Sequence, residues 1–262
     1  MPGNEGIVET YERRGCVIVR NVLDADTMRD IAGHVQWHLG RSRPGTELVQ
    51  FARNADDPFW YRIVSDDRLL DIAQEFLGPD IAVFASAYFA KAAGGGKPVP
   101  WHQDSDFWPL EPMTAVSIWL AVDQSVPENG AMRVIAGSHR EGLIEHEAVK
   151  GSTLNAGIPD DRIDASRAEF VVLDPGDVSI HHPHTLHGSL ANNSPMRRCG
   201  LVIRYIATST RICVDDPSIA RALDGEGRWP VAFRLRGGSD HDVNAYVPPP
   251  AFVPGRHYQP ER

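Results

Sequence analysis

Two stretches near the start of the chain place apolar residues at the spacing of an amphipathic helix. Between residues 26 and 38, apolar positions recur every three or four residues, and Asp24 or Asp26 can cap the first amides. A second pattern of this kind runs over residues 66–76 and stops at a Gly-Pro pair, which ends helices. A short apolar run over residues 16–19 predicts a strand before the first helix.

From residue 80 the pattern changes to about eight short apolar or alternating runs. The breaks between them carry GGGKP, PENG, DPGD and NNSP, which supply the positive φ angles and fixed prolines that turns require. Short strands at this spacing are typical of a sandwich or small barrel. We therefore expect one domain over residues 1–262, with helical support over 1–79, a β core over 80–207 and a C-terminal extension over 208–262.

The polar stretch over residues 151–168 interrupts the strand pattern. A long loop of this kind either covers a cavity or is a tolerated surface insertion, and the sequence favours neither.

Composition and charge exclude several classes of protein. Hydrophobic residues make up 42% of the chain, and no apolar run approaches the length of about 18 residues that spans a bilayer, so we expect no membrane segment. The net charge of −9 argues against nucleic-acid binding, which needs clustered Lys and Arg. Three widely spaced cysteines and the lack of a secretory signal favour a reducing cytoplasm. The sequence says nothing of the oligomeric state.

The stretch WHQDSDFW carries the first candidate chemistry. In a strand, residues two apart share a face, so His102 and Asp104 can reach one metal ion. An HxD pair alone is a weak signal. A second histidine-rich run, SIHHPHTLHGS, follows about eighty residues later. Two histidines and one carboxylate that leave coordination positions open are the facial triad of non-haem Fe(II) oxygenases. A closed structural zinc site would instead have four protein ligands.

Three spaced runs carry a resemblance to a known family. The runs WHQDSDFWPL, AVSIWLAVDQSVPENGAMRVIAGSHREG and LDPGDVSIHHPHTLHGSLANNSPMRRCGLVIRY resemble the phytanoyl-CoA dioxygenase family of Fe(II)- and 2-oxoglutarate-dependent oxygenases. The similarity covers residues 11–205. It implies a mainly β protein with supporting α-helices, built on a double-stranded β-helix, which is a cupin-like jelly-roll barrel.

The resemblance also implies roles for individual residues. His102, Asp104 and His187 match the iron ligands, and Arg198 matches the arginine that pairs with the far carboxylate of 2-oxoglutarate. Further positions match the surroundings of the cosubstrate, namely Gln103, Trp119 and Ser189. The implied cofactors are Fe(II), 2-oxoglutarate and O2, and the implied reaction couples conversion of 2-oxoglutarate to succinate and CO2 to oxidation of a small organic molecule. Because related halogenases have a small residue where Asp104 stands, hydroxylation is favoured over halogenation, while desaturation, ring closure and epoxidation would use the same ligands.

A register argument supports Arg198 independently of the resemblance. If ANNSP is a hairpin turn centred between Asn192 and Asn193, then His187 and Arg198 are directly opposed, with Cβ atoms about 5 Å apart. On this interpretation the guanidinium lies beside the metal and can hold a carboxylate in two hydrogen bonds.

The stretch TAVSIWLAVD divides into two faces. Val116, Ile118, Leu120 and Val122 form a bulky face that fits a core. The other face holds small residues and the single indole of Trp119, which leaves room for a ligand in a barrel interior. Plain core packing of Trp119 is the alternative.

The remaining histidines are expected to be peripheral. We expect His181, His182 and His184 at the rim of their strand, with His184 as a substrate contact. His34 and His38 have the spacing of a metalloprotease helix, but no glutamate base accompanies them, so a helix surface is expected.

Further residues are candidates for the substrate pocket. Arg204 has the strand parity of Arg198 and is expected either to bind a substrate carboxylate or phosphate or to pair with a structural carboxylate. Tyr88, Phe107 and Trp108 are candidates for apolar walls near the metal, with core packing as the alternative.

Two other functions stay open at this stage. The chain would be a non-catalytic jelly-roll binding protein if Fe(II) and 2-oxoglutarate gave no succinate. It would be a cupin-type metal-dependent hydrolase or isomerase if it worked without O2. The substrate itself is not readable from the sequence.

Overall fold

The computed structural model describes residues 6–41, 49–51, 56–154, 156–213, 232–238 and 240–260. Four helices occur in these ranges: α1 (Ile7–Arg14), α2 (Ala25–Leu39), α3 (Pro58–Val64) and α4 (Asp67–Leu77). All four precede residue 80, where the strand pattern begins. Asp24, Asp57 and Asp66 cap α2, α3 and α4 by accepting hydrogen bonds from the first backbone amides.

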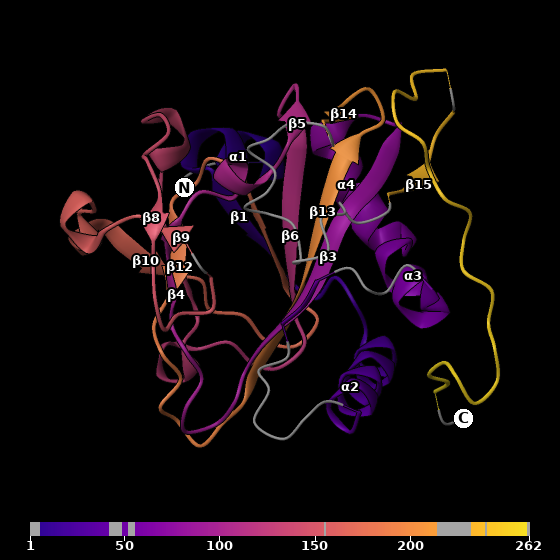
Figure 1. Ribbon diagram of the computed structural model, residues 1–262, viewed down its shortest axis with the longest axis horizontal. Coiled ribbons are helices and arrows are strands. Elements are labelled where there is room, and N and C mark those ends of the chain that lie inside the picture. The colour runs from indigo at the N-terminus through magenta and orange to yellow at the C-terminus, as the bar shows by residue number, and fades with distance from the viewer. Residues whose placement is uncertain are drawn as a thin grey trace.

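Two antiparallel sheets form the body of the molecule (Figure 1). The larger has the order β1-β11-β6-β13-β3-β15, and β2 also pairs with β3. Its strands are β1 (Cys16–Val19), β2 (Val49–Phe51), β3 (Ile81–Lys91), β6 (Ala115–Ala121), β11 (Val178–His181), β13 (Arg198–Ala207) and β15 (Phe233–Arg236).

The smaller sheet has four strands in the order β10-β7-β12-β4. They are β4 (Val99–His102), β7 (Met132–Ile135), β10 (Ala168–Phe170) and β12 (His187–Ser189). Two further pairs join β5 (Leu110–Glu111) to β14 (Arg211–Ile212) and β8 (Glu147–Ala148) to β9 (Ala156–Gly157). The fold is mainly β with supporting helices, as the pattern predicts.

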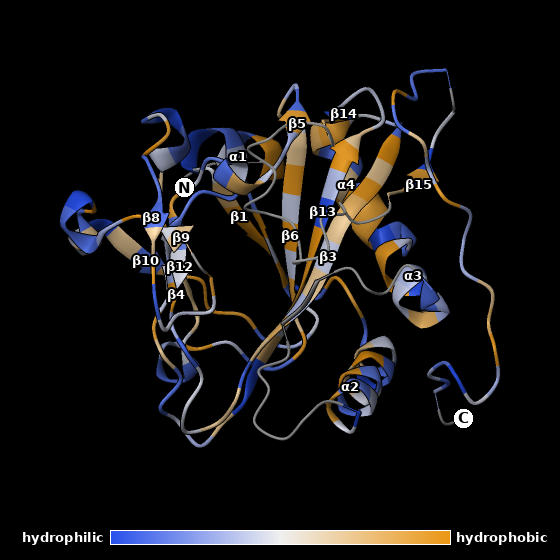
Figure 2. Ribbon diagram, in the orientation of Figure 1, coloured by the Kyte–Doolittle hydropathy of each residue, from blue (hydrophilic) through white to orange (hydrophobic). Residues whose placement is uncertain are grey.

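Helices α2, α3 and α4 lie on the side of the large sheet away from the small one (Figure 1). Their apolar faces pack onto the sheet in a core that includes Ile31, Trp60, Leu69, Ile118 and Leu201, all at most 2% exposed. Along α2, blue and orange turns alternate in Figure 2, as expected for a helix with one buried face. The helices thus close one face of the large sheet and leave its other face to the small sheet.

Most predicted elements are present, with two differences. The structure adds α1 and α3, which the apolar spacing does not reveal because both are short. It also ends strand β4 at His102, so that Asp104 opens a 3-10 helix (Asp104–Phe107) and does not share a strand face with His102.

The polar stretch over 151–168 packs on the small sheet. Ile158 and Ile163 are buried against Trp101 of β4, and the Ile158 amide donates to the Trp101 carbonyl at 2.7 Å. Of the extension over 208–262, residues 214–231, 239 and 261–262 lie outside the described residues. Within the described ranges, no helix is both long and apolar enough to cross a membrane.

Candidate metal centre

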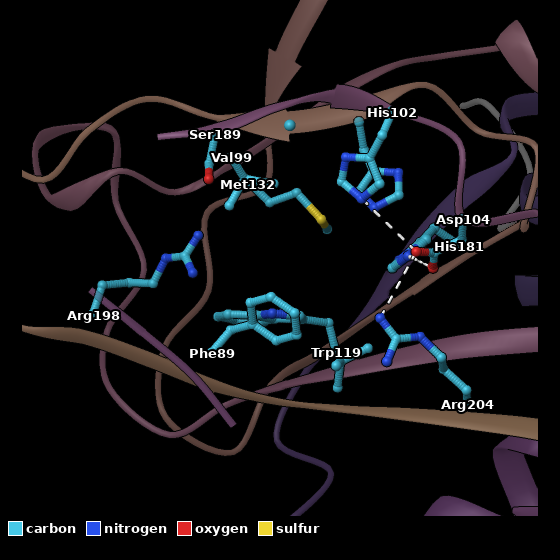
Figure 3. Close-up of a pocket in the computed structure, with 13 residues that line it drawn as sticks. Phe89, Val99, His102, Asp104, Trp119, Met132, His181, Ser189, Arg198 and Arg204 are labelled. Atoms are coloured by element: carbon cyan, nitrogen blue, oxygen red, sulfur yellow. Dashed lines mark ion pairs between the residues drawn. The ribbon is translucent and has the colours of Figure 1, made fainter. Parts of the chain in front are cut away.

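A pocket lies between the two sheets and collects most of the residues singled out by the sequence (Figure 3). The large sheet contributes Phe89, Trp119, His181, Arg198, Val202 and Arg204. The small sheet contributes Val99, His102, Met132, His187, Gly188 and Ser189. Asp104, just after β4, completes the lining.

Three of these side chains converge on one point. His102, Asp104 and His187 are all buried, and their potential ligand atoms lie within 4.8 Å of one another. His102 and His187 are register partners on β4 and β12, with ring centroids 4.0 Å apart. Asp104 reaches the same point because the chain turns at Gln103, which brings its Oδ1 to 3.8 Å from His102 Nε2.

Backbone contacts fix the orientation of both imidazoles. His102 Nδ1 lies 2.9 Å from the Pro100 carbonyl, and His187 Nδ1 lies 2.9 Å from the Thr185 carbonyl. Each Nδ1 therefore carries the proton and donates it, so Nε2 presents a lone pair to the pocket. Burial lowers the pKa of His102 to about 4 and that of His187 well below its usual value, so both rings are neutral.

Asp104 is held as a carboxylate by its neighbours. Ser117 Oγ donates to Oδ2 at 2.9 Å, His181 Nε2 lies 3.4 Å from the same oxygen, and Arg204 Nη2 lies 3.8 Å from Oδ1. Burial alone would raise the pKa of Asp104, but the nearby Arg204 and His181 outweigh it and hold the pKa well below its usual range.

This donor set fits a divalent iron ion. Two neutral imidazoles with free Nε2 lone pairs and one carboxylate are the ligand types of the facial triad, and they line an open pocket, so positions remain for other ligands. Each ligand also has an outer partner that fixes its direction, as in metal sites generally.

Arg198 lies at the opposite end of the pocket from Arg204 (Figure 3). Its Nε and Nη2 both donate to the Gly130 carbonyl, at 3.1 and 2.9 Å, and its guanidinium carbon lies 5.2 Å from the centre of a Trp119 ring. These contacts hold the guanidinium in one orientation. Burial lowers the pKa of Arg198 to about 10, which leaves it charged at neutral pH.

The hairpin register that placed Arg198 opposite His187 is wrong. His187 pairs with His102 and Val134 in the small sheet, whereas Arg198 pairs with Lys91 in the large sheet. The segment between them crosses from one sheet to the other. Its Asn192 pairs with Gly96 and donates through its side chain to the carbonyls of Ala92 and Met196, which ties the turn to the β3–β4 connection. His187 and Arg198 therefore face each other across the pocket and not along a ladder.

Of the other residues predicted to surround the cosubstrate, some line the pocket and one does not. Trp119 and Ser189 line the pocket, and Ser189 Oγ is buried with no hydrogen-bond partner among the described residues. Gln103 does not line it. The Gln103 amide donates to the carbonyls of Gly142 and His184 and accepts from the Ile144 amide, so it joins loops around the site.

The predicted substrate residues are also divided. Arg204 lines the pocket, whereas Phe107, Trp108 and His184 lie outside the lining. Phe107 and Trp108 pack in an apolar cluster beside it: Phe107 lies 6.0 Å from the His102 ring, and Trp108 faces the Arg204 guanidinium at 5.4 Å.

Tyr88 is misplaced by the sequence interpretation. On β3 its neighbour Phe89 faces the pocket, so Tyr88 points to the helix side, where its hydroxyl lies 2.9 Å from His34 Nδ1. It belongs to the core and is not a wall of the pocket.

The expectation that His181 lies at the rim is also wrong. His181 ends β11, is 2% exposed and faces the metal ligands, with its ring centroid 4.6 Å from that of His187. Strand alternation carries the signal: Val178 and Ile180 enter the core, so Ser179 and His181 take the other face. The prolines and histidines that follow do not alter this parity within the strand.

His34 and His38 do not form an exposed helix surface. Both are buried, at 0% and 8% exposure, and Asp57 Oδ2 lies 2.8 Å from His34 Nε2 and 3.5 Å from His38 Nε2. Asp57 thus joins α2 to the start of α3, on the side of the large sheet away from the pocket.

The fold and this donor set together define a class of protein. A structure of EctD from S. alaskensis with 2-oxoglutarate and 5-hydroxyectoine superposes with a TM-score of 0.67 over 90% of this chain and 86% of that one, at 21% identity. The fold is the cupin-like jelly roll of Fe(II)- and 2-oxoglutarate-dependent oxygenases.

Sequence relatives identify the family. The family model described as phytanoyl-CoA dioxygenase matches residues 11–200. The L-proline trans-4-hydroxylase of Streptomyces griseoviridis is 31% identical over 223 residues, covering 74% of this chain and 83% of that protein. A probable alpha-ketoglutarate-dependent hypophosphite dioxygenase of Stutzerimonas stutzeri is 31% identical over 170 residues, covering 62% of this chain but only 59% of that protein. The chain belongs to the phytanoyl-CoA dioxygenase family, whose members use Fe(II), 2-oxoglutarate and O2.

Proposed function

We propose that this protein is an Fe(II)- and 2-oxoglutarate-dependent dioxygenase that hydroxylates a small organic metabolite. His102, Asp104 and His187 hold the iron, and Arg198 binds the far carboxylate of 2-oxoglutarate. The observation that supports these roles best is the convergence of the three ligands at one end of a pocket whose other end holds an immobilised arginine.

Each part of the pocket has a task in this reaction. The bound iron supplies the activation of O2 that the side chains cannot. The neutral histidines present Nε2, and Ser117 keeps the Asp104 carboxylate in place. Arg198 offers a charged donor to a carboxylate, and the unpartnered Ser189 Oγ is available to donate to the same group. Phe89 and Trp119 line the pocket between its two ends (Figure 3).

The names of several relatives support a small substrate. Three of the relatives have names that refer to ectoine, L-proline and hypophosphite, all small molecules. The same pocket has to hold both 2-oxoglutarate and the substrate. We therefore infer a compact substrate and direct hydroxylation. The three free cysteines fit a cytoplasmic location.

The first test measures succinate formation and 2-oxoglutarate binding. With Fe(II) and O2, wild type should release succinate from 2-oxoglutarate, and His187→Ala should release none. Arg198→Gln should raise the KM for 2-oxoglutarate by about tenfold or more, because it removes charge-assisted bonds worth about 1.5–3 kcal/mol. Metal binding by Arg198→Gln, followed by equilibrium dialysis, should stay at the wild-type level.

Arg197→Gln is the matched control for this test. Arg197 is the preceding residue, pairs with Asp123 and does not line the pocket, so its loss should leave the KM for 2-oxoglutarate unchanged. Absence of succinate under every condition would favour a non-catalytic binding protein, and product formation without O2 would favour a hydrolase or isomerase.

A further inference from the structure

Arg204 and His181 form a polar corner of the pocket that the proposed roles of the iron ligands and Arg198 do not use. Arg204 comes from β13 and His181 from β11, and both approach Asp104 (Figure 3). Arg204 is 7% exposed and His181 is 2% exposed, so both side chains are shielded from bulk water. Polar groups withdrawn from water normally have hydrogen-bond partners.

These partners are missing among the described residues. Arg204 Nε and both ring nitrogens of His181 are buried without a hydrogen-bond partner, and Arg204 Nη2 and His181 Nε2 make only ion-pair contacts with Asp104, at 3.8 and 3.4 Å. The Trp108 ring, 5.4 Å from the Arg204 guanidinium carbon, gives the cation a flat surface to rest on but no acceptor. An acceptor from outside the chain would satisfy both residues.

The far carboxylate of 2-oxoglutarate, bound to Arg198, cannot supply that acceptor. Arg198 and Arg204 are six residues apart on β13, so their Cα atoms are separated by about 20 Å along the strand. Val202 and the Trp119 side chain lie between them and also line the pocket.

The balance of charge identifies the missing partner as an anion. Asp104 is the only acidic residue among the described residues that line the pocket. A ferrous ion, the Asp104 carboxylate, the two carboxylates of 2-oxoglutarate and the two guanidinium groups leave one positive charge uncompensated. A buried charge without a counter-charge is costly, so a further negative group is expected in the loaded site.

We propose that Arg204 and His181 bind an anionic group of the substrate, a carboxylate, phosphonate or phosphinate. This inference rests on the proposed function and specifies its substrate class. The substrate is a small anion, and its charged end holds the atom that is oxidised near the iron. Arg204 pairs with two oxygens of the group, and His181 donates one N–H to it.

Binding of simple probes to a loaded but inactive site tests the proposal. The protein is prepared with Ni(II) in place of Fe(II) and saturated with 2-oxoglutarate, which fills the Arg198 end and prevents turnover. Methylphosphonate, acetate and neutral acetamide are then titrated by calorimetry. Both anions should bind wild type more tightly than acetamide. Arg204→Gln should weaken anion binding by about tenfold or more, since a charged hydrogen bond is worth about 1.5–3 kcal/mol.

Further variants separate recognition from general charge and folding. Arg204→Lys keeps the charge and should bind the anions between wild type and Arg204→Gln. Arg29→Gln removes one positive charge from the exposed part of α2 and should bind them as wild type does. His181→Asn should weaken anion binding without changing acetamide binding. The 2-oxoglutarate affinity of each variant, measured in the same samples, reports whether its pocket is intact.

The outcomes are distinct. Failure of wild type to bind 2-oxoglutarate with metal would overturn the proposed function itself. If 2-oxoglutarate binds but the anions bind wild type no better than acetamide, or bind Arg204→Gln as well as wild type, the anion site is refuted and the proposed function stands.

Discussion

Gly200 determines where Trp119 lies at the Arg198 end of the pocket. It lies on β13 beside Trp119, and a Cβ added at Gly200 would meet Trp119 Cζ2 at 1.9 Å. The indole therefore rests directly on the glycine backbone. In this position it lines the pocket and faces the Arg198 guanidinium.

Gly200→Ala should displace Trp119 and so disturb the cosubstrate site. We expect a loss of about 1–3 kcal/mol in the free energy of unfolding, from overpacking, together with weaker 2-oxoglutarate binding. Urea unfolding and calorimetry measure the two effects. Gly95→Ala, where no atom lies within 4 Å of the added Cβ, is the control and should change neither. Unaltered 2-oxoglutarate affinity in Gly200→Ala would contradict the role given to Trp119.

His182 should make the protein sensitive to acid. Burial, followed by the neighbouring His184 and His139, lowers the pKa of His182 from 6.5 to about 4. As the pH falls from 6.5 to 4, the unfolded chain takes up a proton at this residue that the folded chain does not, so stability is lost in this window and unaffected above it. His182→Gln should make the loss smaller across this range in urea unfolding. The exposed His241→Gln should leave the pH dependence as it is.

Among individual residues, the sequence identifies those whose role follows from a short motif. His102, Asp104, His187 and Arg198 are recognised from short motifs, and the structure brings all four to one pocket. His181 is missed because its role depends on which strands lie beside β11. A sequence without strand order does not show that Ser117, its partner on β6, places it next to Asp104.

Among the elements, α3 owes its position to one carboxylate. Asp57 Oδ1 accepts from the Phe59 and Trp60 amides at the start of the helix, at 2.9 and 3.2 Å, while Oδ2 lies 2.8 Å from His34 of α2. Burial would raise the pKa of Asp57, but the bond from His34 and the other donors lower it below its usual range. The Asp57 side chain thus caps α3 and joins it to the preceding helix, α2.

Asp57→Ala should cost more than the loss of an ordinary cap. We expect about 2–4 kcal/mol in the free energy of unfolding, because the cap is lost and the buried His34 loses its partner. Asp24→Ala removes the exposed cap of α2, together with its surface contact to Arg68, and should cost less. Equal losses in the two variants, measured by urea unfolding, would show that the bond to His34 contributes nothing.

Strand positions follow from alternation and turn residues, but strand partners do not. The runs that become β3, β6, β11 and β13 are visible in the sequence, and so is the bulky face of β6. The interpretation of NNSP as a hairpin fails because the same turn residues serve a crossing between sheets. The path of this segment is decided by the contact of Asn192 with the β3–β4 connection, which is far away in the sequence.

For the whole molecule, the core argues against a division near residue 80. One cluster of buried residues joins Tyr11, Ile31 and Leu69 of the helices to Val83 of β3 and extends to Phe233 of β15. We therefore propose that the helical support, the β core and the described part of the extension form one domain.

Calorimetry should then show a single unfolding transition. Because the helices and both halves of the large sheet share one core, they should lose structure together. Addition of Ni(II) and 2-oxoglutarate should shift this transition to higher temperature as one peak, since both bind only the folded chain. The shift should be absent in His187→Ala. Two resolved transitions would contradict the single domain.

The two histidines of the proposed iron site belong to one sheet and both pocket arginines to the other, with consequences for how the pocket can change. The span between iron and the charged anchors is a gap between layers, set by the side chains that keep the sheets about 10 Å apart. Met132, which lines the pocket from β7 and packs with Trp119 in the cluster between the sheets, acts as a spacer in this gap. Substitutions at such spacers should change the distance from the iron site to Arg198 and Arg204 together. They should therefore alter the size of substrate that fits, without replacing a proposed ligand of iron, cosubstrate or substrate.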